Sequence, residues 1–363
     1  MFCRHPTGDQ QQEPFYFEAI YKSINHYSVI NYHLVLHHLI MTVHYNINQL
    51  PVFKNAVVTI GTFDGVHTGH QQILELMLAE AKKVSGETVI ITFNPHPRQV
   101  IAARQTELFL LNTLPEKITL LEKYGIRHLV VTPFTEAFSL QSAEEYIEQF
   151  LVKTFHPHTI IIGHDHRFGK SRSGDFELLK EKSTQYNYSV KEIPGFMLEH
   201  NTISSTMIRQ ALQKGNIDTA NEWLGYAYFF SGLVVEGNKL GRTIGYPTAN
   251  LKIEEEKKLI PGNGVYAVEL VVNGESTMDN SESGPTIIRK GMMNIGVRPT
   301  VEGVNRMIEV NIFDFDREIY GDILTIHLKK RLRNEQKFNG LEELKQQLAR
   351  DKEQAVEWLK VEG

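Results

Sequence analysis

The chain has 363 residues, of which 41% are hydrophobic and 22% are charged, a composition typical of soluble globular proteins. This length exceeds that of one ordinary domain and suits two. The 38 Lys and Arg residues stand against 43 Asp and Glu residues, a formal net charge of −5, so the composition gives no general attraction to nucleic acid or to an anionic membrane. Cys3 is the only cysteine, which excludes an intramolecular disulfide and favours the cytoplasm.

The first forty residues differ from the rest of the chain. Six of the sixteen histidines lie at or before position 44, without helical or strand periodicity. The apolar stretch Val29 to Val43 is interrupted by Asn31 and several histidines and is shorter than the ~20 residues of a membrane span. The beginning of the chain also lacks the pattern of a signal peptide. We expect residues 1–40 to be an extension that is disordered or foreign to the native protein, which would begin at Met41.

Residues 56–193 alternate short apolar runs with segments of helical periodicity, which is typical of a parallel sheet covered by helices. The predicted strands are Val57 to Gly61, Thr88 to Phe93, His128 to Thr132, Thr159 to Gly163 and Tyr188 to Ile193. The predicted helices are Gln71 to Val84, Pro115 to Tyr124 and Ala143 to Val152, and Ser204 to Leu224 is expected to be a helical bridge to the next domain. This pattern predicts a doubly wound α/β domain over residues 41–224, whose ligands bind beyond the carboxyl ends of the strands.

The pattern changes near Tyr226, where β-branched runs separated by Gly, Pro and Asn replace the helical periods. The predicted strands of this half are Phe229 to Glu236, Val265 to Val272, Ile287 to Ile295, Met307 to Phe313 and Ile323 to Leu328. Such short, regularly spaced strands indicate a closed or nearly closed antiparallel barrel. We predict this second domain over residues 225–363, with a terminal amphipathic helix from Leu341 to Lys360.

The first candidate site is the segment GTFDGVHTGH, which follows the first predicted strand of the α/β half. Its glycines allow a close backbone approach to a phosphate, and His67 and His70 lie three residues apart at the expected start of a helix near Thr68. The amides and dipole of a helix N-terminus favour an anion there, and two imidazoles can donate hydrogen bonds to a phosphoryl group that gains charge. The alternative is a glycine turn with two surface histidines.

Four segments together resemble the bacterial riboflavin kinase/FAD synthetase family, within the nucleotidylyltransferase superfamily. They are GTFDGVHTGH, FNPHP (Phe93 to Pro97), GHDHRFGKSRSGD (Gly163 to Asp175) and ISSTMIR (Ile203 to Arg209). The resemblance implies a Rossmann-like nucleotidylyltransferase fold for residues 41–224 and the use of ATP, riboflavin, FMN and FAD as substrates and products.

The resemblance also assigns roles to residues of the α/β half. His67 and His70 would steady the α-phosphate of ATP, while Ser205, Thr206 and Arg209 would hold the β- and γ-phosphates that leave as pyrophosphate. Hydroxyls and amides at a helix start, followed one turn later by a guanidinium, form a reasonable anion cradle. Further ATP-binding positions implied by the resemblance are Gly61, Phe63, Asp64, Gly65, Asn94 and Asp165.

One position departs from the family, because His166 stands where similar proteins usually have Phe. Histidine can stack on a ring as Phe does, but its charge depends on pH, so the adenylylation rate or flavin affinity is expected to differ. An alternative pairs His164 and His166 with His156 or His158 as metal ligands, although no Cys or carboxylate pattern supports zinc.

The second candidate site is the segment LGRTIGYPTANL in the barrel half, which lacks the P-loop pattern. Thr248 and Asn250 are two residues apart on an extended strand, so their side chains point the same way. Both carry hard oxygen donors suited to Mg²⁺ and phosphate. Alone, the segment would be a β-turn followed by two polar strand residues.

Three later segments follow in the order of riboflavin kinases: PGNGVYA (Pro261 to Ala267), MNIGVRPT (Met293 to Thr300) and EVNIFDFDREIYG (Glu309 to Gly321). The resemblance implies a riboflavin-kinase barrel that binds Mg²⁺-ATP on Thr248 and Asn250, with Gly241 and Arg242 in the ATP site. Glu309 would be the general base toward the ribityl 5′-hydroxyl; alternatively, it is a strand carboxylate in a cross-strand ion pair. Arg333 and the terminal helix would contact flavin.

The family's usual E-x-H pattern appears here as Glu309, Val310 and Asn311, so a secondary polar contact is expected to change.

The principal hypothesis is therefore a bifunctional enzyme. The barrel would convert riboflavin and ATP to FMN and ADP, and the α/β domain would convert FMN and ATP to FAD and pyrophosphate by direct in-line attack, without a covalent enzyme intermediate. One alternative retains a single activity, with the other half a flavin-binding or docking module. Another is a flavin-sensing regulator, against which the lack of a basic helix-turn-helix argues. Partners beyond these small molecules are not indicated, and an oligomer remains open.

Overall fold

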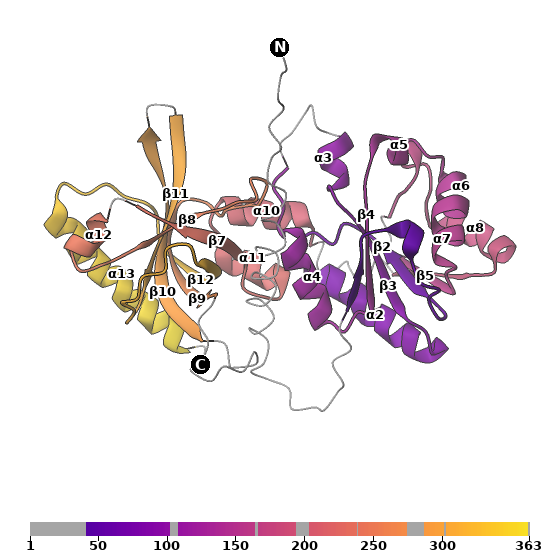
Figure 1. The fold of residues 1–363 in the computed structure, drawn as a ribbon, viewed down its shortest axis with the longest axis horizontal. Helices are drawn as coiled ribbons and strands as arrows, with labels where there is room; N and C mark the ends of the chain where they lie inside the picture. The colour runs from indigo at the N-terminus through magenta and orange to yellow at the C-terminus, as the bar shows by residue number, and fades with distance from the viewer. Residues whose placement is uncertain are drawn as a thin grey trace, which may run out of the picture. The chain divides into compact units, whose positions relative to one another are not determined.

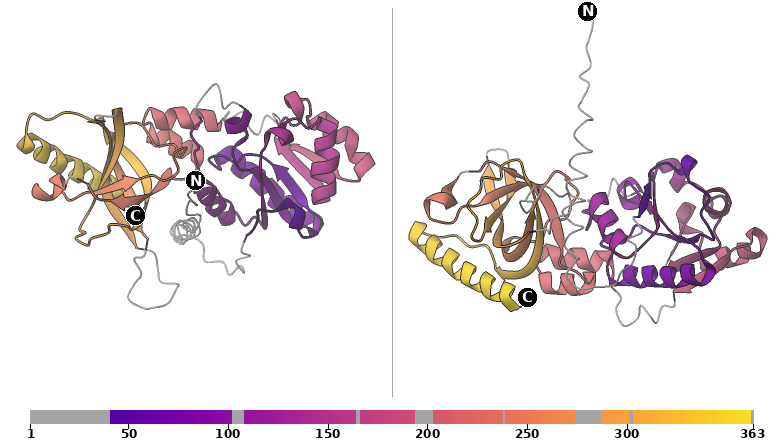
Figure 2. Two further views of the ribbon diagram at one scale, coloured as in Figure 1. Left: turned by 45° about the horizontal axis from the view of Figure 1, so that its top comes forward. Right: turned by 60° about the horizontal axis from the view of Figure 1, so that its bottom comes forward.

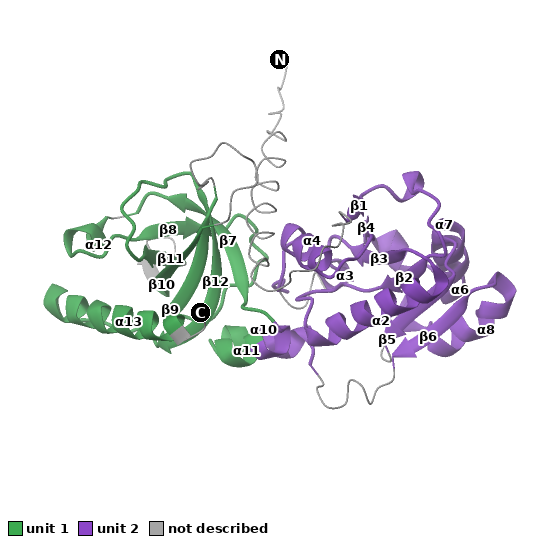
Figure 3. Cartoon of the chain, turned by 90° about the horizontal axis from the view of Figure 1, so that it is seen from below, with its two compact units in different colours: residues 1–32, 211–221, 226–363 green, residues 33–210, 222–225 purple. Residues whose placement is uncertain are grey.

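The computed structural model describes residues 41–101, 108–163, 166–193, 203–237, 239–273, 287–300 and 303–361. The predicted extension over residues 1–40 lies outside these ranges. The described chain forms two compact units (Figure 3). The α/β unit contains the described residues up to 210 together with 222–225, and the barrel unit contains residues 211–221 and those from 226 onward. Within the described ranges, no helix is both long enough and apolar enough to cross a membrane.

The α/β unit is built on a parallel sheet, as predicted, and this sheet has six strands where five were expected (Figure 1). In spatial order the strands are β1 (Thr42–His44), β4 (His128–Thr132), β3 (Thr88–Phe93), β2 (Val57–Ile60), β5 (Thr159–Gly163) and β6 (Ser189–Ile193). The chain moves outward from β2 through β3 to β4 and then returns to the other side of β2 as β5. The topological switch point, where such sheets bind ligands, therefore lies between β2 and β5. The edge strand β1 was not predicted, because three residues are too few to show a period.

Helices cover both faces of this sheet (Figure 2). Helix α2 (Thr68–Val84) packs on β2, β3 and β5. On the opposite face, an apolar cluster joins Val58, Val89 and Ile160 of the strands to Tyr146 and Phe150. Helix α4 (Leu114–Lys123) begins with a capping box, and the unit also contains α3 (Pro97–Ile101), α5 (Glu136–Ser139) and α8 (Phe176–Tyr186).

Two helix predictions need correction. The segment expected as one α-helix from Ala143 to Val152 consists of α6 (Ala143–Glu145) and a π-helix (Tyr146–Val152), followed by α7 (Lys153–Phe155). Periodicity could not reveal this, since the apolar spacing fits either winding. The expected helix from Ser204 to Leu224 is two helices, α10 (Ser205–Gln213) and α11 (Ile217–Leu224). Gly215 separates them with φ +73°, a left-handed conformation that ends helices.

The barrel unit is a closed antiparallel barrel, also as predicted. In spatial order its strands are β10 (Ile288–Thr300), β11 (Gly303–Ile312), β8 (Ala249–Lys252), β7 (Phe229–Val235), β12 (Ile323–Arg333) and β9 (Gly264–Val272). Helix α13 (Leu341–Val361) lies along β9, β10 and β12, where Ala355 and Leu359 join an apolar cluster with Ala267 and Met292. The four-residue strand β8 was absent from the predicted strands, although Thr248 and Asn250 were expected to be extended.

Candidate active sites

The loop between β2 and α2 forms the first site. Helix α2 begins at Thr68 with His67 as its N-cap residue, which matches the predicted helix start. Gly65 has φ +90°, and a Cβ there would lie 2.7 Å from Leu111 Cδ1, so this tight turn requires glycine. The turn buries Phe63, Asp64 and Val66 and brings the second half of the loop to the carboxyl end of β2.

His67 and His70 lie together at the start of α2. Their rings stack with centroids 3.8 Å apart and an interplanar angle of 20°, and the ring of Phe63 lies 4.9 Å from that of His70. The Nδ1 atoms of both histidines are buried, without a hydrogen-bond partner among the described residues. A Cβ at residue 69 would lie 3.3 Å from the His67 ring, so Gly69 leaves room for this imidazole. Two buried ring nitrogens thus remain for a ligand.

Burial controls the charge of these histidines. It lowers the pKa of His67 to about 4, with a smaller opposing effect of Asp64 and a further lowering by Arg209. The pKa of His70 is also lowered well below its usual value, first by burial and then by the charges of His67 and Lys117. Both rings are therefore neutral at pH 7. A neutral imidazole donates one hydrogen bond and accepts another, so the pair can bind a phosphoryl oxygen without adding positive charge.

Asp64 and Arg209 form a buried ion pair that ties this loop to α10. Asp64 is 1% exposed, and its Oδ1 accepts hydrogen bonds from the backbone N–H groups of Leu111 (2.9 Å) and Asn112 (3.2 Å). Its Oδ2 accepts from Arg209 Nη2, while Arg209 Nε donates to the carbonyl oxygen of Phe109 at 2.8 Å. The Asp64 carboxylate is thus held inside the protein by two backbone amides and the Arg209 guanidinium.

Ser205 strengthens the same connection, because its Oγ donates to the carbonyl oxygen of Asp64 at 2.9 Å. The next residue, Thr206, is exposed in the first turn of α10. At the carboxyl end of β3, Asn94 is also exposed. Gly61 follows β2 directly and donates its backbone N–H to the carbonyl oxygen of Ile91 at 3.0 Å. Asp165 lies outside the described residues.

Two residues that lie near this site were not singled out from the sequence. His96 follows β3, and burial is the main cause that lowers its pKa to about 4. Lys117 is buried in α4 and donates to Thr92 Oγ1 at 3.5 Å. The sequence held a signal for Lys117, because it stands three residues after Leu114 and four before Leu121, on the apolar stripe of the helix.

The metal alternative gains no support from the described residues. No group of three or more His, Cys, Asp or Glu side chains within the described ranges could hold a metal ion. His164 lies outside these ranges, and the ring of His166 lies tilted at 33° to that of Phe168, with centroids 5.9 Å apart.

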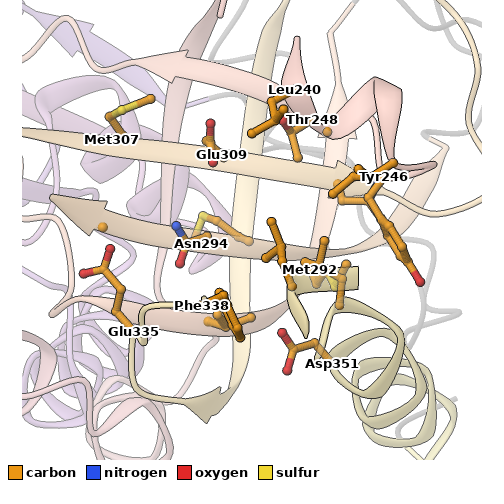
Figure 4. Close-up of a pocket in the computed structure, with 18 of the residues that line it drawn as sticks. Leu240, Tyr246, Thr248, Met292, Asn294, Met307, Glu309, Glu335, Phe338 and Asp351 are labelled. Atoms are coloured by element: carbon orange, nitrogen blue, oxygen red, sulfur yellow. The ribbon is translucent and has the colours of Figure 1, made fainter. Parts of the chain in front are cut away.

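The second site is a cavity of about 380 Å³ in the barrel unit (Figure 4). Thr248, Asn250 and Glu309 all line it. Asn250 in β8 pairs directly with Glu309 in β11, and Glu309 pairs on its other side with Asn294 in β10. Directly opposed residues have Cβ atoms ~4.5–5.5 Å apart. The barrel thus places a carboxylate between two amides, beside the threonine hydroxyl.

Two glycines shape the wall around Thr248 and Asn250. A Cβ on Gly241, in the short helix α12 (Leu240–Thr243), would lie 2.2 Å from the carbonyl oxygen of Tyr246. A Cβ on Gly237 would lie 2.0 Å from Asn250 Nδ2. Gly241 is therefore required for the close approach of the Tyr246 backbone, and Gly237 leaves room for the Asn250 amide in its present position. Arg242 is exposed and is absent from the lining of the cavity.

Asn311 has a structural contact of its own. It is buried, and its Nδ2 donates to the carbonyl oxygen of Pro247 at 2.7 Å. This bond fixes the residue before Thr248 to β11, two residues beyond Glu309. The asparagine that departs from the family pattern therefore anchors the turn carrying the predicted phosphate and metal ligands.

Arg333 lines the cavity, but its guanidinium is held by α13. Nε lies 2.9 Å from Oδ1 of Asp351, and Nη2 lies 2.7 Å from Oδ2. Asp351 is 0% exposed, and Gln347 Nε2 donates to its Oδ1 at 2.8 Å. The guanidinium also lies 5.7 Å from the centre of the Phe338 ring. This network, which the sequence did not reveal, fixes both α13 and an aromatic wall of the cavity.

The donors at this cavity fit Mg²⁺. The threonine hydroxyl, the asparagine carbonyl and the Glu309 carboxylate are hard oxygens, the type this ion prefers, and Mg²⁺ usually completes its shell with water and substrate phosphates.

The two halves of the chain match two different family models. Residues 50–207 match the family model described as FAD synthetase, and residues 224–359 match the one described as riboflavin kinase. The bifunctional riboflavin kinase/FMN adenylyltransferase of Escherichia coli K12 is 37% identical over 320 residues, covering 88% of this chain and 97% of that protein. The protein of the same description from Bacillus subtilis 168 is 35% identical over 306 residues, covering 84% of this chain and 92% of that protein.

A solved structure also resembles the chain as a whole. A Streptococcus pneumoniae protein described as a macrolide-efflux protein has a TM-score of 0.77 and 31% identity, covering 88% of this chain and 99% of that one. The combination of an α/β unit and a barrel is thus shared with an experimentally determined fold.

Proposed function

Because the chain belongs to the family of bacterial bifunctional riboflavin kinase/FMN adenylyltransferases, we propose that its two described sites carry the two activities of that family. The barrel unit phosphorylates riboflavin with ATP to give FMN and ADP. The α/β unit transfers the adenylyl group of ATP to FMN, which gives FAD and pyrophosphate. Both family models match, which supports two activities over the single-activity and regulator alternatives.

For the kinase, we assign Glu309 as the general base that accepts the proton of the ribityl 5′-hydroxyl. The observation that carries this assignment is the direct pairing of Glu309 with Asn250 on the wall of the cavity. Thr248 and Asn250 would hold Mg²⁺ with the nucleotide phosphates, and the ion would neutralise charge on the transferred phosphoryl group. The buried Asn311 positions this segment through Pro247, and Arg333 with Phe338 provides the flavin-facing wall.

For the adenylyltransferase, we assign His67 and His70 as neutral hydrogen-bond donors to the α-phosphoryl group. Their stacked rings and buried nitrogens support this role. Ser205 and Thr206 begin α10, whose N-terminal amides suit the departing pyrophosphate. Arg209 would bind a phosphate through Nη1, because within the described residues its side-chain hydrogen bonds to Phe109 and Asp64 use Nε and Nη2. Gly61, Phe63, Gly65 and Asn94 complete the proposed ATP site.

We further propose the domain division 41–224 and 225–363, supported by the ranges of the two family matches. A cytoplasmic location agrees with the single cysteine and the substrates. The net charge of −5 supports small molecules rather than nucleic acid or membranes as partners.

One flavin conversion assay tests both site assignments. The purified chain is incubated with ATP and Mg²⁺ and either riboflavin or FMN, and the flavins are separated. Glu309→Gln should lower FMN formation by about 10²–10⁴-fold, the usual contribution of a general base, while FMN added directly is still converted to FAD.

The matched variant for the other site is the double substitution His67→Ala and His70→Ala. It should stop FAD formation and leave FMN formation unchanged. If Glu309→Gln formed FMN at the normal rate, or if the unmodified chain made FMN but no FAD, the corresponding assignment would be wrong.

A further inference from the structure

Lys117 is a buried lysine whose surroundings do not balance its charge. It is 7% exposed, and burying an ammonium is costly without a partner of opposite charge. Its Nζ makes one long hydrogen bond, 3.5 Å, to Thr92 Oγ1. Within the described residues, Lys117 forms no ion pair. The ammonium group can donate three hydrogen bonds, so donors remain beyond the one partner that the described residues supply.

The position of Lys117 points to what that group is. Thr92 is the penultimate residue of β3, and its hydroxyl also donates to the carbonyl oxygen of Thr62, just after β2. The charge of Lys117 lowers the pKa of His70 and of His96, which places it near both rings. The lysine therefore lies at the carboxyl ends of β2 and β3, among the residues assigned to adenylyl transfer.

The other titratable side chains described near Lys117 either have partners of their own or are neutral. Asp64 is the carboxylate that acts on Lys117, but it is bonded to Arg209 and to two backbone amides. The histidines of the site are neutral at pH 7, because burial lowers the pKa of His67 and of His96 to about 4. Lys117 is thus a positive charge placed beside neutral hydrogen-bond donors.

We propose that Lys117 is a catalytic residue of adenylyl transfer, whose ammonium binds a non-bridging oxygen of the phosphoryl group passed from ATP to FMN. In this step an oxygen of the FMN phosphate forms a bond to the α-phosphorus, while the bond to pyrophosphate breaks and its electron pair leaves with pyrophosphate. Two anions must approach each other, and a fixed cation lowers the cost of that approach. The inference rests on the proposed function of the α/β unit.

The charge state of Lys117 suits this role. Burial lowers its pKa to about 8, and Asp64 opposes the shift. The group is therefore mostly protonated at pH 7 in the free protein, and a bound phosphate would favour its charged form further.

The test compares Lys117→Met with Lys117→Arg in the full chain, with Lys123→Met as the matched control. Lys123 stands in the same helix but is exposed. FAD formation from added FMN should fall by about 10²–10³-fold in Lys117→Met, the usual effect of removing one donor to a developing charge. Lys117→Arg should retain more activity than Lys117→Met, and Lys123→Met should behave as the unmodified chain. FMN formation from riboflavin is measured in the same samples and should be unchanged.

The outcomes separate this inference from the function on which it rests. If the unmodified chain does not convert FMN to FAD, the proposed function fails. If it does, but Lys117→Met stays within threefold of it, the function stands and the role of Lys117 is refuted.

A pH profile distinguishes a catalytic lysine from a structural one. The rate of the unmodified chain should fall above about pH 8, as Lys117 loses its proton. In Lys117→Arg this basic limb should move to higher pH, because a guanidinium stays protonated. The groups facing Lys117 are Asp64, which is held in its ion pair with Arg209, and His70 and His96, whose pKa values are lowered by burial. An unmoved limb in Lys117→Arg, together with slow Lys117→Met, would indicate a structural lysine and overturn the proposal.

Discussion

The two candidate sites suit similar phosphate chemistry, but they are built on different kinds of structural element. The proposed kinase site lies on the wall of a barrel, where strand pairing sets Glu309 between Asn250 and Asn294 around a cavity of about 380 Å³. The proposed adenylyltransferase site lies on loops and helix starts, where the buried pair Asp64 and Arg209 joins segments that are distant in the sequence. A site on strands inherits its geometry from backbone pairing. In this protein the site on loops also depends on a buried ion pair, so we expect it to be more sensitive to charge changes.

The largest expected effect is the loss of stability that follows when the buried ion pair between Asp64 and Arg209 is removed. Arg209→Met leaves the Asp64 carboxylate buried without its counter-charge, which typically costs about 3–5 kcal/mol. We expect the α/β unit to lose stability while the barrel unit keeps its own. Each unit holds one tryptophan, Trp223 or Trp358, so urea unfolding of Trp223→Phe and Trp358→Phe backgrounds reports on each unit separately.

The control for this prediction is the double variant Asp64→Asn with Arg209→Met, which removes both charges. It should recover part of the stability lost in Arg209→Met. Equal unfolding midpoints for Arg209→Met and the unmodified chain would show that the pair does not hold the loop.

A second expected effect is a loss of stability of the α/β unit in acid. Because the pKa of His67 and of His96 is about 4 in the folded α/β unit and ~6.5 in an unfolded chain, the unfolded state binds more protons between these values. The free energy of unfolding should therefore be fully maintained above about pH 6.5 and fall as the pH is lowered toward 4.

Urea unfolding at pH 7, 6, 5 and 4 checks this prediction, with Trp223 as the reporter. His67→Gln should flatten the dependence, since glutamine does not titrate. A slope identical in His67→Gln and the unmodified chain would contradict the predicted contribution of this histidine.

The smallest effect is expected from Asn311. Asn311→Ala removes the hydrogen bond to the Pro247 carbonyl, and a bond of this kind contributes about 1 kcal/mol. We expect the KM for ATP of the kinase to rise by about fivefold, because the turn that carries Thr248 is less well held. FAD formation from added FMN should not change.

Asn311→His is the matched variant, because histidine is the residue that similar kinases carry and its ring can also donate. Activity near that of the unmodified chain in Asn311→His, with a raised KM in Asn311→Ala, would support a positioning role. An unchanged KM in Asn311→Ala would exclude it.

The sequence by itself determined the two architectures and the principal motifs. Buried strands of a parallel sheet are continuous apolar runs, and short β-branched runs between turn residues indicate a barrel, so local patterns were sufficient for both folds. The start of α2 at Thr68 and the extended segment around Thr248 and Asn250 could likewise be predicted, since helix starts and strand alternation depend on neighbouring residues.

Only the tertiary structure decided which residues meet and which remain available to a ligand. Arg209 was expected to bind phosphate, but its Nε and Nη2 atoms are bonded to Phe109 and Asp64. Arg333 is likewise engaged by Asp351, and Lys117 and His96 acquire their significance from neighbours on other elements. Such pairings join residues far apart in the chain, and their strength depends on burial. Neither quantity is contained in the local periodicity that defines helices and strands.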